Sequence, residues 1–400
     1  MSEFDPEKFI NERVDQIREI VGDARALIAV SGGVDSTTCA ALTHAAIGDN
    51  LLCVILDDAF MREGEPERVA QLLSQPPLGL PVEILDVRAR FLTALKGLTD
   101  AEEKRKAFRE TFYRTLGETA EKGKFRHLVQ GTIQADIEET TRGVKTQHNV
   151  LSQVGINPLE RYGFQIIEPL LTLYKPQVRA VARFLKVPAE MSERQPFPGP
   201  GLSVRVVGEV RADKLEALQK ATAIAEESLA EYQPSQYFAA ILDNMEVSDY
   251  PRLRQIKERM SHFLNVPSRN VSLSVFHDKA TGVRSGERRY GDIAAMKVVA
   301  EDRNIFQPPI ISLVALQEEV LRENRPFTRA LYAIKEKTVR KPYVVALRAV
   351  QTRDFLSARV SEIPWSTLNA TAERILAACS NVSSVYYDVT PKPPATIEME

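Results

Sequence analysis

The segment 31–36, Ser-Gly-Gly-Val-Asp-Ser, constrains this chain more than any other feature of its sequence. It follows the apolar run 26–30 and precedes a second apolar stretch, which predicts a buried strand, a glycine turn and a helix. Two adjacent glycines let the backbone approach a ligand closely, and the unpaired amides at a helix start favour an anion. The carboxylate of Asp35 can hold the Mg²⁺ that accompanies a nucleotide. The segment therefore predicts a loop that binds phosphate groups.

This loop is not a Walker loop, which requires a lysine that is absent here. It resembles the pyrophosphate loop of ATP pyrophosphatases, which cleave ATP between the α and β phosphates and adenylate a substrate. The alternative is an ordinary turn between a strand and a helix. Such a turn does not account for the combination of all six residues. The predicted ATP-binding residues of this loop are Ser31, Gly32, Gly33, Val34, Asp35 and Ser36, with Asp35 also the predicted metal ligand.

The overall composition is that of an ordinary globular protein of two or three domains, with 44% hydrophobic and 26% charged residues in 400. Lys and Arg number 52 against 54 Asp and Glu, a balance that argues against a nucleic-acid partner. No apolar run approaches the length of a membrane span, and the start of the sequence shows no signal-peptide pattern. The three cysteines Cys39, Cys53 and Cys379 are odd in number and far apart, which predicts a reducing, cytoplasmic location without disulfides. Cys39 and Cys53 lie in apolar runs, which predicts core roles for these two.

Strands and helices are predicted to alternate along the first half of the chain. The predicted strands are 26–30, 51–56, 82–85 and 127–132, and the predicted helices are 5–20, 65–73 and 102–122. This alternation predicts an α/β fold with a doubly wound parallel sheet, whose ligands bind at the carboxyl ends of the strands. Asp35, Asp57, Asp58 and Gln130 all follow predicted strands, so we expect them at that edge.

A domain boundary is predicted near 194–201, where three prolines and two glycines exclude a regular helix or central strand. The alternatives for this stretch are a plain linker and a rigid loop that contacts substrate. We predict an ATP pyrophosphatase domain at 1–205 and a C-terminal α+β dimerisation domain at 206–400. A weak similarity of 282–299 to 333–350, and of 270–278 to 381–388, predicts an internal duplication of about 232–305 and 328–400.

Several further motifs make the resemblance specific. The chain resembles the ATP-pyrophosphatase part of GMP synthase, with an adenine nucleotide alpha-hydrolase-like sheet followed by an enlarged dimerisation region. The motifs that carry the resemblance cover nearly the whole chain and lie at 4–23, 90–95, 100–106, 130–133, 196–210, 344–350 and 387–400. The resemblance implies that ATP adenylates O2 of the xanthine base of XMP, that pyrophosphate leaves, and that ammonia displaces AMP to give GMP.

The same resemblance assigns further site residues. A mobile lid at 143–149 would bring Lys145 and His148 to the reacting phosphates as catalytic residues, although the sequence pattern alone favours a solvated loop there. Three residues after a predicted strand, Gln130, Gly131 and Thr132, would complete the ATP site. The residues assigned to the nucleotide substrate are Arg90, Arg194, Pro198, Gly199, Lys392, Thr396 and Glu398.

Partners and alternatives follow from the same comparison. Only 30 residues precede the pyrophosphate loop, so we expect ammonia from a separate glutaminase subunit, and we expect a homodimer. The sequence departs from the family pattern at several positions near those that contact the substrate base in family members. They include Gln147, Gln195, Ala395 and Met399. The alternatives are therefore a paralogue for a related purine nucleotide, a NAD synthetase, a sulfur transferase that modifies tRNA, and a catalytically silent nucleotide-binding homologue.

Overall fold

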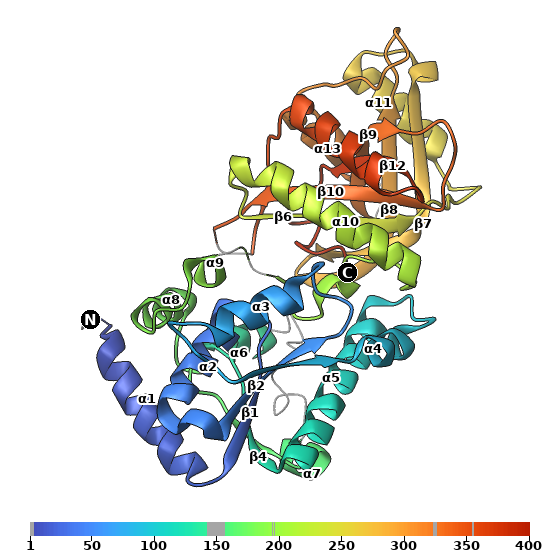
Figure 1. The fold of residues 1–400 in the computed structure, drawn as a ribbon. Coiled ribbons are helices and arrows are strands. Elements are labelled where there is room, and N and C mark those ends of the chain that lie inside the picture. The colour runs from blue at the N-terminus through green and yellow to red at the C-terminus, as the bar shows by residue number, and fades with distance from the viewer. Residues whose placement is uncertain (1–3, 142–156, 194, 196, 323–325, 354–355) are drawn as a thin grey trace. The chain divides into compact units, whose positions relative to one another are not determined.

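The structure is a computed structural model that describes residues 4–141, 157–193, 195, 197–322, 326–353 and 356–400. The chain divides into two compact units (Figure 1). The first contains Met1–Ala94 and Arg105–Pro200, and the second contains Leu95–Lys104 and Gly201–Glu400. The sequence placed the boundary after residue 205 and did not single out residues 95–104 as part of the second unit. None of the described helices is both long and apolar enough to cross a membrane.

The first unit is a parallel α/β domain. Its elements are α1 (Pro6–Val21), β1 (Arg25–Ala29), α2 (Val34–Ile47), β2 (Leu51–Asp57), α3 (Glu65–Ser74), β3 (Val82–Asp86), α4 (Arg88–Leu95), α5 (Ala101–Gly123), β4 (Phe125–Val129), α6 (Gln134–Thr141), α7 (Pro158–Tyr162), β5 (Gln165–Ile167), α8 (Lys175–Phe184) and α9 (Ala189–Ser192). The five parallel strands lie in the order β3-β2-β1-β4-β5. This arrangement confirms the predicted doubly wound sheet, and each strand and helix predicted from the sequence is present.

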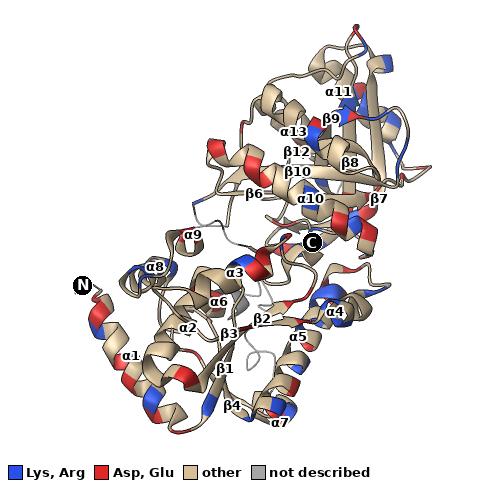
Figure 2. Cartoon of the chain, viewed as in Figure 1, with Lys and Arg blue, Asp and Glu red and all other residues tan. Residues whose placement is uncertain are grey.

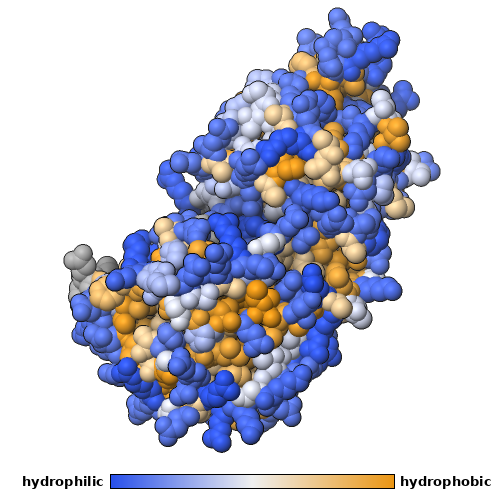
Figure 3. Space-filling model, in the orientation of Figure 1, coloured by the Kyte–Doolittle hydropathy of each residue, from blue (hydrophilic) through white to orange (hydrophobic). Residues whose placement is uncertain are grey.

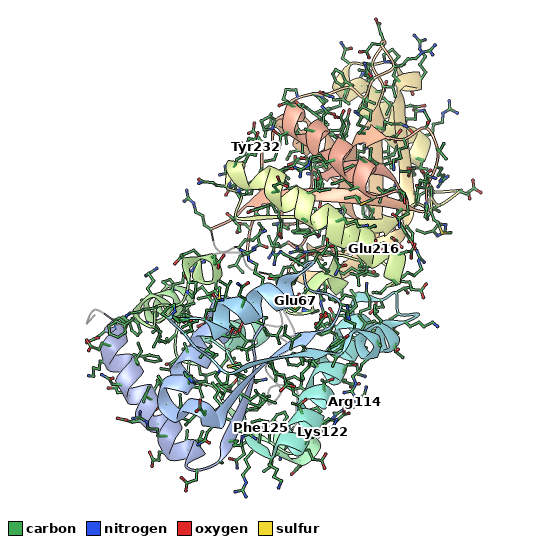
Figure 4. All side chains as sticks on the ribbon, viewed as in Figure 1. Glu67, Arg114, Lys122, Phe125, Glu216 and Tyr232 are labelled. Carbon is green, nitrogen blue, oxygen red and sulfur yellow. The ribbon has the colours of Figure 1, made fainter. Side chains whose placement is uncertain are left out.

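Both faces of this sheet are covered, because alternate side chains of each strand enter different cores. Ala26 and Ile28 of β1 pack in one hydrophobic cluster with residues of α1, α2 and α8. Leu27, between them, packs in a second cluster with Tyr113 and Leu116 of α5. Helices α3 and α5, marked in Figure 4 by Glu67 and Lys122, therefore lie against opposite faces, since Val69 of α3 belongs to the first cluster.

The N-terminal helix shows how local sequence sets the element ends. Helix α1 begins at Pro6, and the Asp5 side chain caps it by accepting a hydrogen bond from the Lys8 N–H at 3.1 Å. It ends at Gly22, whose φ of 55° is a left-handed conformation that glycine adopts without steric cost. All three cysteines are free and buried, which confirms the predicted core roles of Cys39 and Cys53. Burial raises the pKa of the Cys53 thiol to about 12.

The second unit is an α+β domain built on a mixed sheet. Its elements are α10 (Ala212–Leu229), β6 (Gln236–Asp243), α11 (Leu253–Leu264), β7 (Val271–Arg284), β8 (Glu287–Val298), α12 (Ile310–Arg322), β9 (Phe327–Glu336), β10 (Tyr343–Gln351), β11 (Arg359–Val360), α13 (Trp365–Ala378) and β12 (Val382–Asp388). The strand order is β11-β10-β12-β9-β8-β7, and β6 pairs with β10. Strands β7 and β8 form a hairpin, whereas β12 lies between β9 and β10. The two halves of the predicted duplication differ in their strand pairing. The duplication itself stays a prediction.

The surface carries no dominant charge. Acidic and basic residues are interspersed over both units (Figure 2), in keeping with the nearly equal numbers in the sequence. On the face drawn in Figure 3, hydrophilic residues surround a broad apolar area on the first unit, and smaller apolar areas lie on the second unit. Strand β3 lies at one edge of the five-stranded sheet, and its Ile84 is 38% exposed.

Candidate active site

The segment 31–36 forms the turn between β1 and α2, as the sequence predicts. Helix α2 begins at Val34, and its N-cap residue Gly33 provides no side-chain hydrogen bond to the first amides. The Ser36 hydroxyl donates to the Gly33 carbonyl oxygen at 3.2 Å, which tightens the turn. Gly32 has a φ of 75°, and a Cβ there would lie 2.6 Å from Cγ2 of Val69 on α3. Glycine is therefore required in this turn, and the helix start remains open to an anion.

The turn after β4 lies directly against this loop. A Cβ on Gly131 would lie 2.9 Å from the Ser36 nitrogen and 3.0 Å from the Asp35 carbonyl carbon. The two backbones therefore meet where β1 and β4 are neighbours in the sheet. The chain after β1 continues to β2 on one side, and β4 lies on the other, so this is the topological switch point of the sheet. Open α/β sheets bind their ligands at such a point.

Asp35 lies on the first turn of α2 and pairs with a lysine that the sequence analysis missed. The Lys175 Nζ is 2.5 Å from Oδ2 of Asp35, and these side chains are 38% and 26% exposed. Oδ1 of Asp35 is buried without a hydrogen-bond partner among the described residues. Lys175 is the first residue of α8, the helix that follows β5, so its position after a strand of the same sheet was the available signal.

Further carboxylates lie at the same edge of the sheet. Asp57 ends β2 and Asp58 follows it, as predicted, while Glu168 follows β5. Burial raises the pKa of Asp58 to about 7, even though its carboxylate accepts a hydrogen bond from the Phe60 N–H at 2.8 Å. Burial also raises the pKa of Glu168, which the hydrogen bond from the Thr132 side chain partly opposes. The edge therefore combines an open helix start with carboxylates in low-dielectric surroundings.

Among the described residues, no three His, Cys, Asp or Glu side chains are grouped to hold a metal ion on their own. This fits Mg²⁺ bound with a nucleotide, because Mg²⁺ commonly takes only one or two protein carboxylates and completes its shell with phosphate oxygens and water. The buried, unpartnered Oδ1 of Asp35 is a donor atom of the required kind.

The side chain of Gln130 points into the core. Its Nε2 donates to the Tyr113 hydroxyl at 2.6 Å, and its backbone N–H donates to the Ile167 carbonyl oxygen. The Sγ of buried Cys39 donates to the Gln130 carbonyl oxygen at 3.4 Å. Gln130 thus fastens the turn after β4 to the sheet, which leaves the neighbouring Gly131 to face the pyrophosphate loop.

The predicted lid and part of the predicted nucleotide site lie outside the described residues, namely Lys145, His148 and Arg194. Arg90, on α4, donates to the Thr115 hydroxyl at 3.0 Å and to Glu118 of α5 at 2.6 Å. Pro198 and Gly199 lie in the turn that closes the first unit. Next to them, the Arg62 guanidinium stacks 4.2 Å from the centre of the Phe197 ring.

The predicted nucleotide residues of the C-terminal segment lie in the second unit, in a tail (residues 389–400) that is bound by buried cations. Glu398 accepts hydrogen bonds from Nε and Nη2 of Arg205 at 2.9 and 3.0 Å, a partner that the sequence did not predict. The Thr396 hydroxyl accepts from Arg329 Nη2 at 3.0 Å and lies 3.0 Å from the Thr281 carbonyl oxygen, to which it donates. The backbone of Lys392 exchanges hydrogen bonds with Ala358.

Two fully buried arginines hold the backbone of this tail. Arg348 donates to the carbonyl oxygens of Ile397 and Thr396 at 2.8 and 2.9 Å. Arg329 and Arg348 both pair with the carboxylate of Asp388, at 2.8 and 2.7 Å. Burial and the neighbouring Arg348 lower the pKa of Arg329 to about 9. Beside the tail, a cavity of about 170 Å³ is lined by residues that include Arg284, Arg289, Tyr290 and Pro394.

Two family models match parts of this chain. The model for NAD synthase matches residues 7–203, and the model for the GMP synthase C-terminal domain matches residues 332–399. Two solved structures resemble half of this chain at 18% identity, namely NMN synthetase from Francisella tularensis (TM-score 0.40, 79% of that chain) and NH3-dependent NAD synthetase from Campylobacter jejuni (TM-score 0.38, 81% of that chain).

Curated relatives match the chain from end to end, and each is one subunit of a glutamine-hydrolyzing GMP synthase. The relative from Sulfurisphaera tokodaii is 42% identical over 397 residues, which cover 99% of this chain and 100% of that protein. The relatives from Methanopyrus kandleri and Archaeoglobus fulgidus are 39% and 38% identical, each with 99% of this chain and 100% of the relative covered. With an open pyrophosphate loop in one unit and the matching C-terminal domain in the other, this chain belongs to the family of ATP-pyrophosphatase subunits of GMP synthase.

Proposed function

We propose that this chain catalyses the ATP-dependent amination of XMP to GMP. The observation that carries the proposal is the 42% identity to a GMP synthase subunit over 99% of the chain. In this reaction the xanthine O2 attacks the α phosphorus of ATP and pyrophosphate leaves. Ammonia then attacks C2 of the adenylated base and displaces AMP.

The residues at the β1–α2 turn suit the first step. Loss of pyrophosphate concentrates negative charge on the leaving group, and donors that are already in place stabilise such charge most effectively. The uncapped amides at the start of α2 and the hydroxyls of Ser31 and Ser36 are such donors. Mg²⁺ bound to Asp35 would neutralise phosphate charge as a Lewis acid. With Asp35 holding the metal, the ammonium of Lys175 would be available to donate to the phosphates.

The finer assignments are also proposals. We assign Lys145 and His148 to the lid over the phosphates, and Arg90, Arg194, Pro198 and Gly199 to the purine nucleotide. Lys392 in the tail would donate to the phosphate monoester of XMP. We assign the cavity lined by Arg284, Arg289 and Pro394 to the same nucleotide. Glu398, which is 18% exposed, forms an ion pair with the buried Arg205, so we infer that it orients this end of the tail and does not pair with Lys392.

Partner subunits are proposed on two grounds. The relatives are each named as one subunit of a glutamine-hydrolyzing enzyme, which supports a separate subunit that releases ammonia from glutamine. A homodimer through the second unit is supported by the resemblance and by exposed apolar side chains such as Phe263 of α11 and Ile311 of α12, which are 44% and 60% exposed. Sedimentation of the purified chain measures this state directly.

The function is tested by incubating the purified chain with ATP, Mg²⁺, ammonium chloride and XMP while AMP, pyrophosphate and GMP are quantified. We expect all three products in equal amounts, and no GMP when glutamine replaces ammonium. Parallel reactions replace XMP by IMP or by nicotinate adenine dinucleotide. Turnover of either of these in preference to XMP would contradict the proposal, as would ATP cleavage with no aminated product.

A further inference from the structure

The carboxylate of Glu400 is completely buried in the second unit and is held by three groups from different parts of the chain. Its Oε1 accepts hydrogen bonds from the Gly208 N–H at 2.9 Å and from the Tyr290 hydroxyl at 2.8 Å. Its Oε2 forms an ion pair with the ammonium of Lys104, which is 1% exposed. We call Lys104, Gly208 and Tyr290 the Glu400 socket.

The socket is specific for a carboxylate. The Lys104 ammonium also donates to the carbonyl oxygens of Val206 and Gly208 at 2.7 and 2.9 Å. These two hydrogen bonds fix its position independently of Glu400. A buried ammonium without a counter-charge is strongly unfavourable, and a buried carboxylate is tolerated only when it is paired and hydrogen-bonded. Glu400 and Lys104 therefore satisfy each other, and no other register of the tail places a carboxylate there together with Glu398 at Arg205.

The socket is also connected to the proposed nucleotide site. Tyr290, which donates to Glu400, lines the 170 Å³ cavity together with Arg289 and Pro394. The Thr281 N–H donates to the Met399 carbonyl oxygen at 2.8 Å, so the residue before Glu400 is attached to β7. The position of Glu400 therefore fixes the register of the tail that carries Lys392. It also fixes Tyr290, which forms part of the wall of this cavity.

We propose that Glu400 is a positioning residue that holds the tail in register for the nucleotide substrate without contacting that substrate. The inference rests on the proposed function, because it assumes that the tail binds XMP. It differs from a purely structural role in one respect: loss of the socket should weaken XMP binding selectively, while ATP, assigned to the first unit, binds as before.

The test compares Glu400→Gln with Glu336→Gln. The control makes the same chemical change in an ion pair of this unit that does not contact the tail, between Glu336 and Lys297 at 2.8 Å. Glutamine at 400 keeps an acceptor for the Gly208 N–H but turns N–H groups toward the Lys104 ammonium. Hydrogen–deuterium exchange of the amides of 395–400 is measured without ligands, and the KM values for XMP and ATP and kcat are then measured with ammonium chloride.

For Glu400→Gln we expect faster exchange in the tail and a KM for XMP raised about 10- to 100-fold, the range for one lost hydrogen bond to a charged group. The KM for ATP should stay within twofold, and Glu336→Gln should change neither KM. If Glu400→Gln does not fold, Tyr290→Phe removes the hydroxyl that donates to Glu400 and to the Thr99 carbonyl oxygen, without altering charge, and we expect the same pattern at about three- to tenfold.

Three results would overturn the inference. They are unchanged tail exchange, faster exchange with an unaltered KM for XMP, and an equal rise of both KM values. A wild-type chain that forms no GMP from XMP while its tail exchange responds to Glu400→Gln would refute the proposed function instead, and the nucleotide part of this inference with it.

Discussion

Replacing Asp35 by asparagine separates a catalytic role of this carboxylate from a structural one, because the two predict effects of different size. Asp35 and Lys175 are 26% and 38% exposed, so their ion pair is partly screened by solvent. Pairs of this kind contribute about 0.2–1 kcal/mol to stability. Asp35→Asn should therefore lower the free energy of unfolding by no more than about 1 kcal/mol.

The catalytic effect should be much larger. Removing one group that stabilises charge in a transition state typically costs about 100- to 1,000-fold in rate, which corresponds to about 2.7–4 kcal/mol. We expect kcat for pyrophosphate release to fall by this factor, and the Mg²⁺ concentration needed for half-maximal rate to rise. The assay measures pyrophosphate and AMP over a series of Mg²⁺ concentrations, together with urea unfolding of the same variant.

Asp49→Asn is the matched control. Asp49 is exposed in the short turn after α2, at the opposite end of this helix from Asp35, so the same change there should leave rate and stability unaltered. Turnover of Asp35→Asn within threefold of wild type, with an unchanged Mg²⁺ requirement, would refute the assignment of Asp35 to the metal.

Three further predictions follow from buried groups. Burial raises the folded-state pKa of Asp58 from 3.8 to about 7, so the folded protein holds a proton that the unfolded chain loses, and stability should fall as pH rises from about 4 to about 7. Asp58→Asn should remove up to about 4 kcal/mol of this fall, and equal pH slopes in urea unfolding of both proteins would contradict it. Gly131→Ala places a Cβ 2.9 Å from the Ser36 nitrogen, so kcat/KM for ATP should drop at least tenfold with little change in the KM for XMP, whereas normal ATP kinetics would show that the two turns separate freely. Asp388→Ala leaves two fully buried arginines without their shared carboxylate and should destabilise the protein by about 3–5 kcal/mol in urea unfolding; a loss below about 1 kcal/mol would mean that these arginines find other partners.

Burial of the tail determines which change in it is informative. Ala395, Met399 and Glu400 are 0% exposed, and Arg205, Arg329 and Arg348 have partners within 396–398. Deleting residues 392–400 would therefore open a core and leave buried cations unpaired, so we expect loss of the second unit's stability as well as loss of nucleotide binding. Point substitutions in the tail separate these two effects, and the deletion does not.

The sequence by itself determined the elements whose signals are local. Apolar residues at helical spacing predict the helix over 5–20 that the structure has as α1, with Gly22 at its end, and the glycines of 31–36 specify the turn between β1 and α2. The carboxyl ends of parallel strands lie at one edge of a sheet. The positions of Asp35, Asp57 and Asp58 after predicted strands were therefore enough to locate them at that edge.

Only the tertiary structure decided which distant groups pair. Lys175 lies 140 residues from Asp35. Its place after a strand puts it at the same edge of the sheet, but its local sequence does not identify Asp35 as the partner of its ammonium. The tail shows the same limit: its resemblance to a known motif suggested residues facing a nucleotide, whereas Glu398 contacts Arg205 and Glu400 contacts Lys104. Such pairs depend on the packing of segments that lie 140 residues or more apart in the sequence. A periodic pattern reports which face of an element is buried, but it carries no information about the partner that satisfies a buried charge.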